Sequence, residues 1–191
     1  MATASDDIVW AVDGGGTRCR LACEVAGRRF AVTAGPANAT TDFDGALATL
    51  QGGLAALAAQ AGVSVSAFRA APGHVAVAGV LDAATSQRVQ RALGLQNAEV
   101  TDDRRAAVRG ALGGAGGAVA ALGTGSFFAV VQDGALRLSG GWGARLGDEA
   151  SGHWIGREAL TATLAAHDAL RPATPLTVAL LERFGDSAAE L

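Results

Sequence analysis

The sequence predicts an α/β protein of two lobes, each built on a mixed sheet with helices on its faces. The first observation is the order of the patterns: three short apolar runs in succession, then helical and strand patterns in alternation up to about residue 112. Such alternation favours a mixed sheet covered by helices. The second is a repeated arrangement, in which an apolar strand leads into a turn of small residues and returns as a hairpin, at residues 8–25 and again at 118–131. This repetition predicts two related lobes that face each other across a cleft.

The first lobe opens with a set of hairpin strands. An apolar run from Ile8 to Val12 ends at Asp13, residues 21–25 form its returning strand, and residues 28–32 form a third strand. Between the first two strands lie Gly14 to Gly16, which we expect to supply the permissive backbone angles of a tight turn.

A long amphipathic helix follows these strands. Asp42 is the expected N-cap and Gly62 the expected end. Its apolar side chains recur at steps of four and three, as one face of a helix requires: Phe43, Leu47, Leu50, Leu54, Leu57 and Ala61. The remaining elements of this lobe are expected at residues 74–80 (strand), 85–93 (helix), 98–100 (strand) and 103–112 (helix).

The glycine-rich stretch Gly110–Gly117 marks the expected boundary, so that residues 1–113 form the N-terminal lobe and 114–191 the start of a C-terminal lobe. Strands are expected at 118–122, 127–131 and 136–138. A helix to about Leu170 is expected next, with Asp148 at or before its N-terminus. A last helix is expected to open at Thr174-Pro175 and to close at Gly185. Four residues of the first of these helices are expected to point inward: Trp154, Ile155, Ala159 and Leu164. The second lobe is expected to be incomplete.

Composition excludes several classes of protein. The net charge of −3 and the lack of a basic patch argue against nucleic acid as a partner, and no apolar run is long enough to span a membrane. Residues 1–7 are polar and acidic, unlike a signal peptide. The chain contains no lysine, which excludes a Walker-type P-loop lysine, a Schiff base and a lysine general base.

The two cysteines, Cys19 and Cys23, are expected on one strand as buried, small apolar side chains, too poorly placed for a disulfide. Free thiols of this kind predict a cytoplasmic protein. The three histidines, His74, His153 and His167, show no metal-ligand spacing.

Two turns of small residues are candidates for binding phosphate. Asp13-Gly14-Gly15-Gly16-Thr17 and Leu122-Gly123-Thr124-Gly125-Ser126 each follow an apolar strand, so their backbone N–H groups can face an anion. Together they could hold one polyphosphate from both sides. An ordinary hairpin turn remains an alternative for the first of them.

Three aspartates complete the candidate site. Asp13 and the pair Asp102-Asp103 fall at the carboxyl ends of strands, where ligands bind in such sheets. A helix N-cap remains an alternative for Asp102, and also for Asp148.

These motifs resemble those of the N-acetylglucosamine kinase family. Three further stretches share the resemblance: Gly140-Gly141-Trp142-Gly143, Leu146-Gly147-Asp148-Glu149-Ala150-Ser151 and Trp154-Ile155-Gly156-Arg157-Glu158-Ala159-Leu160. That family belongs to the BadF/BadG-type ATPase group of the actin, hexokinase and Hsp70 superfamily. The resemblance implies a ribonuclease H-like, actin/hexokinase-type fold. It also implies the ATP-dependent phosphorylation of an amino sugar, N-acetylglucosamine or glucosamine, at the 6-hydroxyl, with ATP and Mg²⁺.

The resemblance also implies roles for single residues. Asp13 corresponds to the residue that holds Mg²⁺ through water, and Asp103 to the general base that accepts the proton of the sugar hydroxyl. The phosphate contacts correspond to Gly14, Gly15, Gly16 and Thr17 in the first turn, and to Gly123, Thr124, Gly125 and Ser126 in the second. The sugar contacts correspond to Asn38, Asp103, Thr124 and Asp148.

The chain departs from the family in two respects. Members usually have Asn-Asp where this chain has Asp102-Asp103, and two adjacent carboxylates repel each other, which raises the pKa of one of them. Members are also usually longer, and the additional part carries the adenosine pocket.

Two other functions stay open. One is a non-catalytic sugar-binding or regulatory protein. The other is an ATPase activator of the same group, which would need exposed cysteines for an iron–sulfur cluster shared between subunits. A homodimer is also left open.

Overall fold

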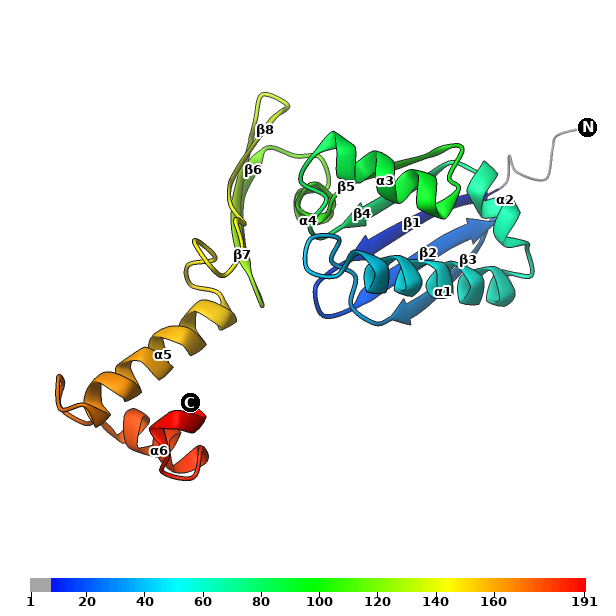
Figure 1. Cartoon of the computed structure of the whole chain (residues 1–191). Coiled ribbons are helices and arrows are strands. Elements are labelled where there is room, and N and C mark those ends of the chain that lie inside the picture. Colours follow the sequence, from blue (N-terminus) through cyan, green and yellow to red (C-terminus); the bar gives the residue numbers. More distant parts are fainter. Residues whose placement is uncertain (1–7) are drawn as a thin grey trace, which may run out of the picture. The chain divides into compact units, whose positions relative to one another are not determined.

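The computed structural model describes residues 8–191, so the prediction made for residues 1–7 lies outside the described part. The chain divides into two compact units, Met1–Gly114 and Ala115–Leu191 (Figure 1). The sequence had placed the division one residue earlier, after residue 113.

Unit 1 is built on a five-stranded mixed sheet of order β3-β2-β1-β4-β5. Strands β1 (Ile8–Gly14), β2 (Cys19–Val25) and β3 (Arg28–Ala34) are antiparallel neighbours. Strands β4 (Gly73–Val77) and β5 (Ala98–Asp102) run parallel to β1. The predicted α/β class is therefore confirmed. Strand β4 ends three residues earlier than predicted, because Gly79 adopts a left-handed backbone (φ 82°) that an extended strand cannot contain.

Helices α1 (Phe43–Ala61), α3 (Ala83–Leu93) and α4 (Asp103–Leu112) match the prediction closely. The side chain of Asp42 caps α1, and Gly62 ends it with φ 70°. The short helix α2 (Val65–Ala70), capped by Ser64, was not predicted. Helix α4 packs against β1, β4 and β5.

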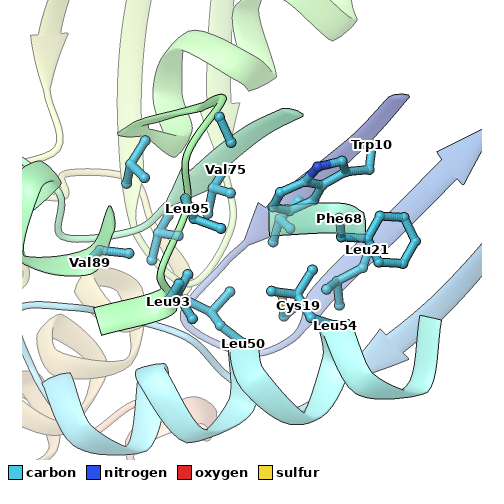
Figure 2. Packing of buried hydrophobic residues seen from close by; sticks show 14 of the residues in the cluster. Trp10, Cys19, Leu21, Leu50, Leu54, Phe68, Val75, Val89, Leu93 and Leu95 are labelled. Atoms are coloured by element: carbon cyan, nitrogen blue, oxygen red, sulfur yellow. The ribbon is translucent and has the colours of Figure 1, made fainter. Parts of the chain in front are cut away.

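The core of unit 1 lies between the sheet and helices α1 to α3. Strand β1 alternates strictly between buried and exposed residues, as a strand with one face on a core does. Figure 2 shows Leu50 and Leu54 of α1 pointing toward Cys19 and Leu21 of the sheet. Cys19 and Cys23 are buried free thiols on one face, as predicted.

Gly53 allows α1 to lie this close to the sheet. A Cβ atom at this position would lie 2.7 Å from Cδ1 of Leu21, which is itself buried. A glycine in the middle of a helix costs about 1 kcal/mol relative to alanine. Here the close packing of α1 on β2 offsets that cost.

Unit 2 contains an antiparallel sheet of order β6-β7-β8 and two α-helices. Its elements are β6 (Gly117–Leu122), β7 (Ser126–Gln132), β8 (Ala135–Gly140), α5 (Gly152–His167), α6 (Pro175–Arg183) and the 3₁₀ helix η1 (Ala188–Glu190). Thr174 caps α6 and Pro175 is its first residue, as predicted.

The prediction for α5 was partly wrong. The helix begins at Gly152, so Asp148 lies before its N-terminus, because Asp148 and Ala150 have left-handed backbones (φ 62° and 64°) that a right-handed helix excludes. It ends at His167, earlier than the expected Leu170. Two residues expected to point inward, Ile155 and Leu164, are 57% and 40% exposed. None of the helices in residues 8–191 combines the length and the hydrophobicity needed to cross a lipid bilayer.

Candidate active site

The parallel strands of unit 1 bring the first group of candidate residues to one edge of the sheet. Gly14, Val77 and Asp102 occupy the same row across β1, β4 and β5. Because parallel strands end at the same edge, Asp13 and the Asp102-Asp103 pair lie at neighbouring strand ends. This is the placement that the sequence predicted.

The turn between β1 and β2 is held by its backbone. The N–H of Gly15 donates to the carbonyl of Arg18 (3.0 Å), and the carbonyls of Gly15 and Gly14 accept from Ala37 (2.9 Å) and Ala78 (2.7 Å). These bonds tie the turn to the loops that follow β3 and β4. Thr17 lies exposed at the turn.

The expected reason for the glycines in this turn was wrong. None of Gly14, Gly15 and Gly16 has a left-handed backbone. At Gly14 the requirement is space, because a Cβ atom would lie 3.3 Å from the carbonyl oxygen of Ala76 and 3.4 Å from Cγ2 of Val77. At Gly16 a Cβ atom would meet nothing within 4 Å, so that position is open.

Asp13 faces a cation from the neighbouring strand. The antiparallel register places Arg20 directly opposite Asp13, and its Nη1 lies 3.6 Å from Oδ2 of Asp13. Both side chains are more than half exposed (57% for Asp13, 55% for Arg20), so this ion pair is open to solvent and weak. Asp13 is therefore accessible to a ligand.

Asp102 is the N-cap of α4, which confirms the alternative that the sequence left open for it. Its Oδ1 accepts a hydrogen bond from the backbone N–H of Arg104 (2.8 Å), and its Oδ2 accepts one from Nε of Arg104 (2.6 Å). Burial pushes the pKa of Asp102 upward, but the hydrogen bonds from Arg104 and Asp103 and the charge of Arg104 more than offset this. The pKa of Asp102 therefore lies below its ordinary value.

The pKa of Asp103, the first residue of α4, is shifted in the opposite direction. Its pKa is raised from 3.8 to about 7 by burial, by a hydrogen bond to Asp102 and by the negative charges of Asp102 and Asp13, while Arg104 opposes the shift. Repulsion by the adjacent Asp102 thus contributes to the shift, as expected, and Asp103 is the carboxyl group of the pair whose pKa is raised. A carboxyl group that titrates near neutral pH can act as a general base.

Asn38 belongs to a loop that is tied to the end of β4. Its Oδ1 accepts hydrogen bonds from the backbone N–H groups of Thr40 (2.9 Å) and Thr41 (3.2 Å). The hydroxyl of Thr40 donates to the carbonyl of Gly79 (2.9 Å). Position 79 has no room for a side chain, because a Cβ atom on Gly79 would lie 2.6 Å from Oδ1 of Asn38. The side-chain oxygen of Asn38 thus fixes the loop, and its amide nitrogen is the group suited to donate to a ligand.

Unit 2 holds the second candidate turn against the start of α5. The carbonyls of Gly123 and Thr124 accept from the N–H groups of Gly152 (2.8 Å) and His153 (3.3 Å). The buried hydroxyl of Ser126 donates to the carbonyl of Glu149 (2.7 Å). The hydroxyl of Ser126 is therefore used within the protein, and only the backbone of this residue could serve a phosphate.

Asp148 lies beside this turn. Asp148 is 8% exposed, and its Oδ2 lies 2.8 Å from the position that a Cβ atom of Gly125 would take. Gly125 is therefore required by the close approach of Asp148. Ser151, not Asp148, caps α5, so the capping alternative for Asp148 was wrong. Asp148 and Thr124, both expected to contact sugar, belong to one local cluster in unit 2.

Two residues next to the candidate site were missed in the sequence. Arg20 could have been found by counting along the hairpin, since it lies opposite Asp13. Arg104 carried another signal. A cation in the first turn of a helix is disfavoured by the helix dipole, so an arginine there suggests a specific acidic partner, which is Asp102.

Comparison with known proteins places this chain in a family. The model of the BadF/BadG/BcrA/BcrD ATPase family matches residues 11–186. The chain belongs to this family. Its fold is the actin-like ATPase fold that the sequence predicted. The same fold is seen in the ethanolamine utilization protein EutJ from Carboxydothermus hydrogenoformans, which is 17% identical with a TM-score of 0.52 over 96% of this chain and 64% of EutJ.

The relatives of this ATPase family member include sugar kinases. Glucosamine kinase GspK of Vibrio cholerae is 29% identical over 176 residues, which are 91% of this chain and 60% of the kinase. N-acetyl-D-glucosamine kinase of Dictyostelium discoideum is 45% identical over 53 residues, 28% of this chain and 17% of that protein. A candidate N-acetylglucosamine kinase from Chromobacterium violaceum superimposes with a TM-score of 0.80 at 29% identity, over 96% of this chain and 66% of that structure. The chain therefore spans less than two thirds of the length of these relatives.

Proposed function

We propose that this ATPase family member transfers the γ-phosphoryl group of ATP to a hydroxyl group of an amino sugar, glucosamine or N-acetylglucosamine, at the 6-position. The observation that carries the proposal is the position of Asp103, which directly follows the carboxyl end of β5 as the first residue of α4. Burial and the neighbouring Asp102 raise its pKa to about 7. Phosphoryl transfer needs a group near the attacking oxygen that can accept its proton, together with phosphate positioning and charge neutralisation. The names of the Vibrio and Dictyostelium relatives support the choice of substrate.

In this proposal Asp103 accepts the proton of the sugar hydroxyl as that oxygen attacks the γ-phosphorus. Such general-base catalysis contributes about 10²- to 10⁴-fold to a rate. Asn38, Thr124 and Asp148 would each contact another hydroxyl of the sugar. Thr17 and the backbone of Gly123–Ser126 would contact the phosphates.

Asp13 fits a role in binding Mg²⁺ through water. It is a half-exposed carboxylate at a strand end, and Mg²⁺ commonly keeps several waters and is bound through one or two carboxylates. When bound, Mg²⁺ supplies positive charge to the phosphates. Because the chain lacks lysine, the exposed Arg20 beside Asp13 is the side chain best placed to add to that charge. We also propose a cytoplasmic location, consistent with two free, buried cysteines.

A coupled assay of ADP release across a panel of hexoses and hexosamines tests this proposal in the intact protein. We expect release to depend on an amino sugar and on Mg²⁺. Asp103→Asn should reduce that release at least about 100-fold and leave sugar affinity, measured by calorimetry, largely unchanged. Unaltered turnover in this variant would exclude Asp103 as the base.

A non-catalytic sugar-binding protein is the second candidate function. Calorimetry with sugar and with MgATP separates the two, because sugar binding without nucleotide binding would support this second function. The ATPase-activator alternative is disfavoured, because both cysteines are buried where an iron–sulfur cluster would need exposed ones.

A further inference from the structure

Arg104 and Asp102 form a tightly held pair next to the proposed base. Both side chains are largely buried, 16% exposed for Arg104 and 11% for Asp102. Two nitrogens of the guanidinium group contact Oδ2 of Asp102, while Oδ1 accepts from the backbone of Arg104. Both oxygens of Asp102 are thus engaged, which fixes its side chain in one orientation.

Asp103 is attached to this pair. Asp102 caps α4, so it fixes the start of the helix at which Asp103 is the first residue. After burial, a hydrogen bond to Asp102 is the next cause that raises the pKa of Asp103, and the same bond lowers the pKa of Asp102, so Asp103 is the donor when it is protonated. As long as this bond exists, the proton on Asp103 prevents it from accepting another one from a substrate. The orientation of Asp103 and its release as a base therefore both depend on Asp102 and Arg104.

We propose that Asp102 and Arg104 are positioning residues for Asp103, which orient its carboxyl group and decide when it is free to accept the proton of the substrate hydroxyl. This inference rests on the proposed kinase function. Neither residue needs to touch the sugar or the nucleotide.

The groups that face Asp103 come from each element packed around it. β1 contributes Asp13, β5 contributes Asp102 and α4 contributes Arg104. The neighbouring end of β4 is apolar, with Ala76 and Val77. Burial, the hydrogen bond to Asp102 and two negative charges therefore hold the proton on Asp103, and one positive charge favours its loss.

The pair predicts opposite effects for two substitutions. Asp102→Asn removes a negative charge, so the pKa of Asp103 should fall and activity should begin at a lower pH. Asparagine is also a good N-cap, so α4 should keep its start. Arg104→Met removes the positive charge and retains the apolar stem, so the pKa of Asp103 should rise and activity should begin at a higher pH. A purely structural role would lower activity in both variants without moving their pH profiles apart.

Two readouts test the inference in the intact protein. The first is the titration of Asp103 followed by ¹³C NMR of labelled aspartate carboxyl groups without substrate or metal, with Asp103→Asn to assign the signal. The second is the pH profile of kcat/KM for sugar phosphorylation. With a pKa near 7, the native rate at pH 6 should be about a tenth of its plateau, whereas Asp102→Asn should reach about half or more. Arg104→Met should lower the rate at pH 7 from about half to about a tenth of its plateau.

Matched controls separate charge from damage. Arg104→Lys keeps the charge and should restore a profile close to the native one. Arg105→Met removes a charge from an exposed position on the same helix and should leave the profile unchanged. Should both Asp102→Asn and Arg104→Met leave the Asp103 titration where it is, the inference is wrong. If the titration shifts as expected but no sugar is phosphorylated at any pH, the kinase function fails while the coupling among these three residues stands.

Discussion

In unit 1 the sheet and helices α1 to α3 enclose a continuous cluster of buried apolar side chains, whereas residues 115–191 bury a single one, Ala129. The buried polar residues show the reverse distribution, since all five that the structure describes between residues 8 and 191 lie in unit 2: Ser126, Asp148, Ser151, Thr163 and Thr177. Within the described part of the chain, all but two of the exposed large hydrophobic side chains, Val9 and Leu81, also lie in unit 2. Unit 1 is thus held by a core and unit 2 by local hydrogen bonds.

This difference has consequences for the site. A hydrogen bond contributes only about 0.5–1.5 kcal/mol net to stability, less than the full burial of a large apolar side chain. Asp13 and Asp103 are therefore carried by the more rigid part of the molecule, as a base that must be aligned with its substrate requires. The turn at Gly123–Ser126 depends on bonds such as that from Ser126 to Glu149. Unit 2 should open at a lower free energy than unit 1.

The largest expected effect tests the core itself. Leu57→Ala in unit 1, at a side chain with no exposed surface, should lower the free energy of unfolding by about 2–5 kcal/mol. Ile155→Ala in unit 2, at a 57% exposed residue, should change it by about 0.5 kcal/mol or less. Amide hydrogen exchange under increasing urea, read separately for each unit by mass spectrometry, measures both. An equal loss in the two variants would mean that Ile155 is covered in solution, which would remove the contrast between the units.

The second-largest expected effect concerns the carboxyl group of Asp103 in unit 1. Because the pKa of Asp103 is raised to about 7, the native state holds a proton that the unfolded state loses near pH 4. The unfolded state therefore binds fewer protons between about pH 4 and pH 7, and stability falls as pH rises through this window. Asp103→Asn should accordingly stabilise unit 1 at pH 8 by about 1–2 kcal/mol, after allowance for solvent screening.

The same variant provides its own control. At pH 5 the native carboxyl group is still protonated, so the gain from Asp103→Asn should be clearly smaller than at pH 8. Urea unfolding at both values measures it. Equal gains at pH 5 and pH 8 would show that the substitution acts through packing and not through the charge.

A third effect compares glycines in the helices of the two units. Gly53→Ala in α1 should cost about 1–2 kcal/mol, because its Cβ atom would lie 2.7 Å from Cδ1 of the buried Leu21. Gly156→Ala in α5 should stabilise by up to about 1 kcal/mol, since nothing lies within 4 Å of that position. Thermal unfolding of the two variants measures the difference in sign.

Gly52→Ala is the matched control within α1. Its Cβ atom would also meet nothing within 4 Å, so it should stabilise unit 1 as Gly156→Ala stabilises unit 2. A destabilising Gly52→Ala would attribute the cost at Gly53 to the helix as a whole instead of to Leu21.

The sequence predicted unit 1 more accurately than unit 2. In unit 1 the period of the apolar residues, the cap at Asp42 and the end at Gly62 predicted α1 to the residue. Among the helices and strands described in residues 8–114, only the six-residue α2 was missed, since it is too short to show a period. In unit 2 the helical pattern of α5 was recognised, but Ile155 and Leu164 were wrongly expected to be buried. Periodicity indicates which face of a helix is apolar and does not indicate whether anything covers it.

The site was predictable to a similar degree. The strand ends placed Asp13 and Asp103 correctly, because parallel register follows from the order of elements. The ion pair of Asp102 with Arg104 was not predictable from strand order, because it depends on how one side chain folds back over the first turn of a helix. The left-handed backbone at Asp148 was equally hidden, since it occurs at a residue other than glycine.

The smallest expected effect concerns two hairpin turns. It tests whether a turn contributes the same amount to stability in a unit with an apolar core and in a unit without one. Both units contain a two-residue hairpin turn with left-handed residues, Ala26-Gly27 (φ 49° and 75°) in unit 1 and Asp133-Gly134 (φ 51° and 75°) in unit 2. Aspartate tolerates this conformation better than alanine does, and Asp-Gly is a favoured pair for such turns. Ala26→Asp should therefore stabilise unit 1, and Asp133→Ala should destabilise unit 2, each by about 0.5 kcal/mol. Urea unfolding of the two variants measures these changes.

Because the turns are alike and the units that contain them differ, equal and opposite changes would show that the turns contribute locally. A loss at Asp133 much larger than the gain at Ala26 would show that unit 2, without an apolar core of its own, depends on its turns for order.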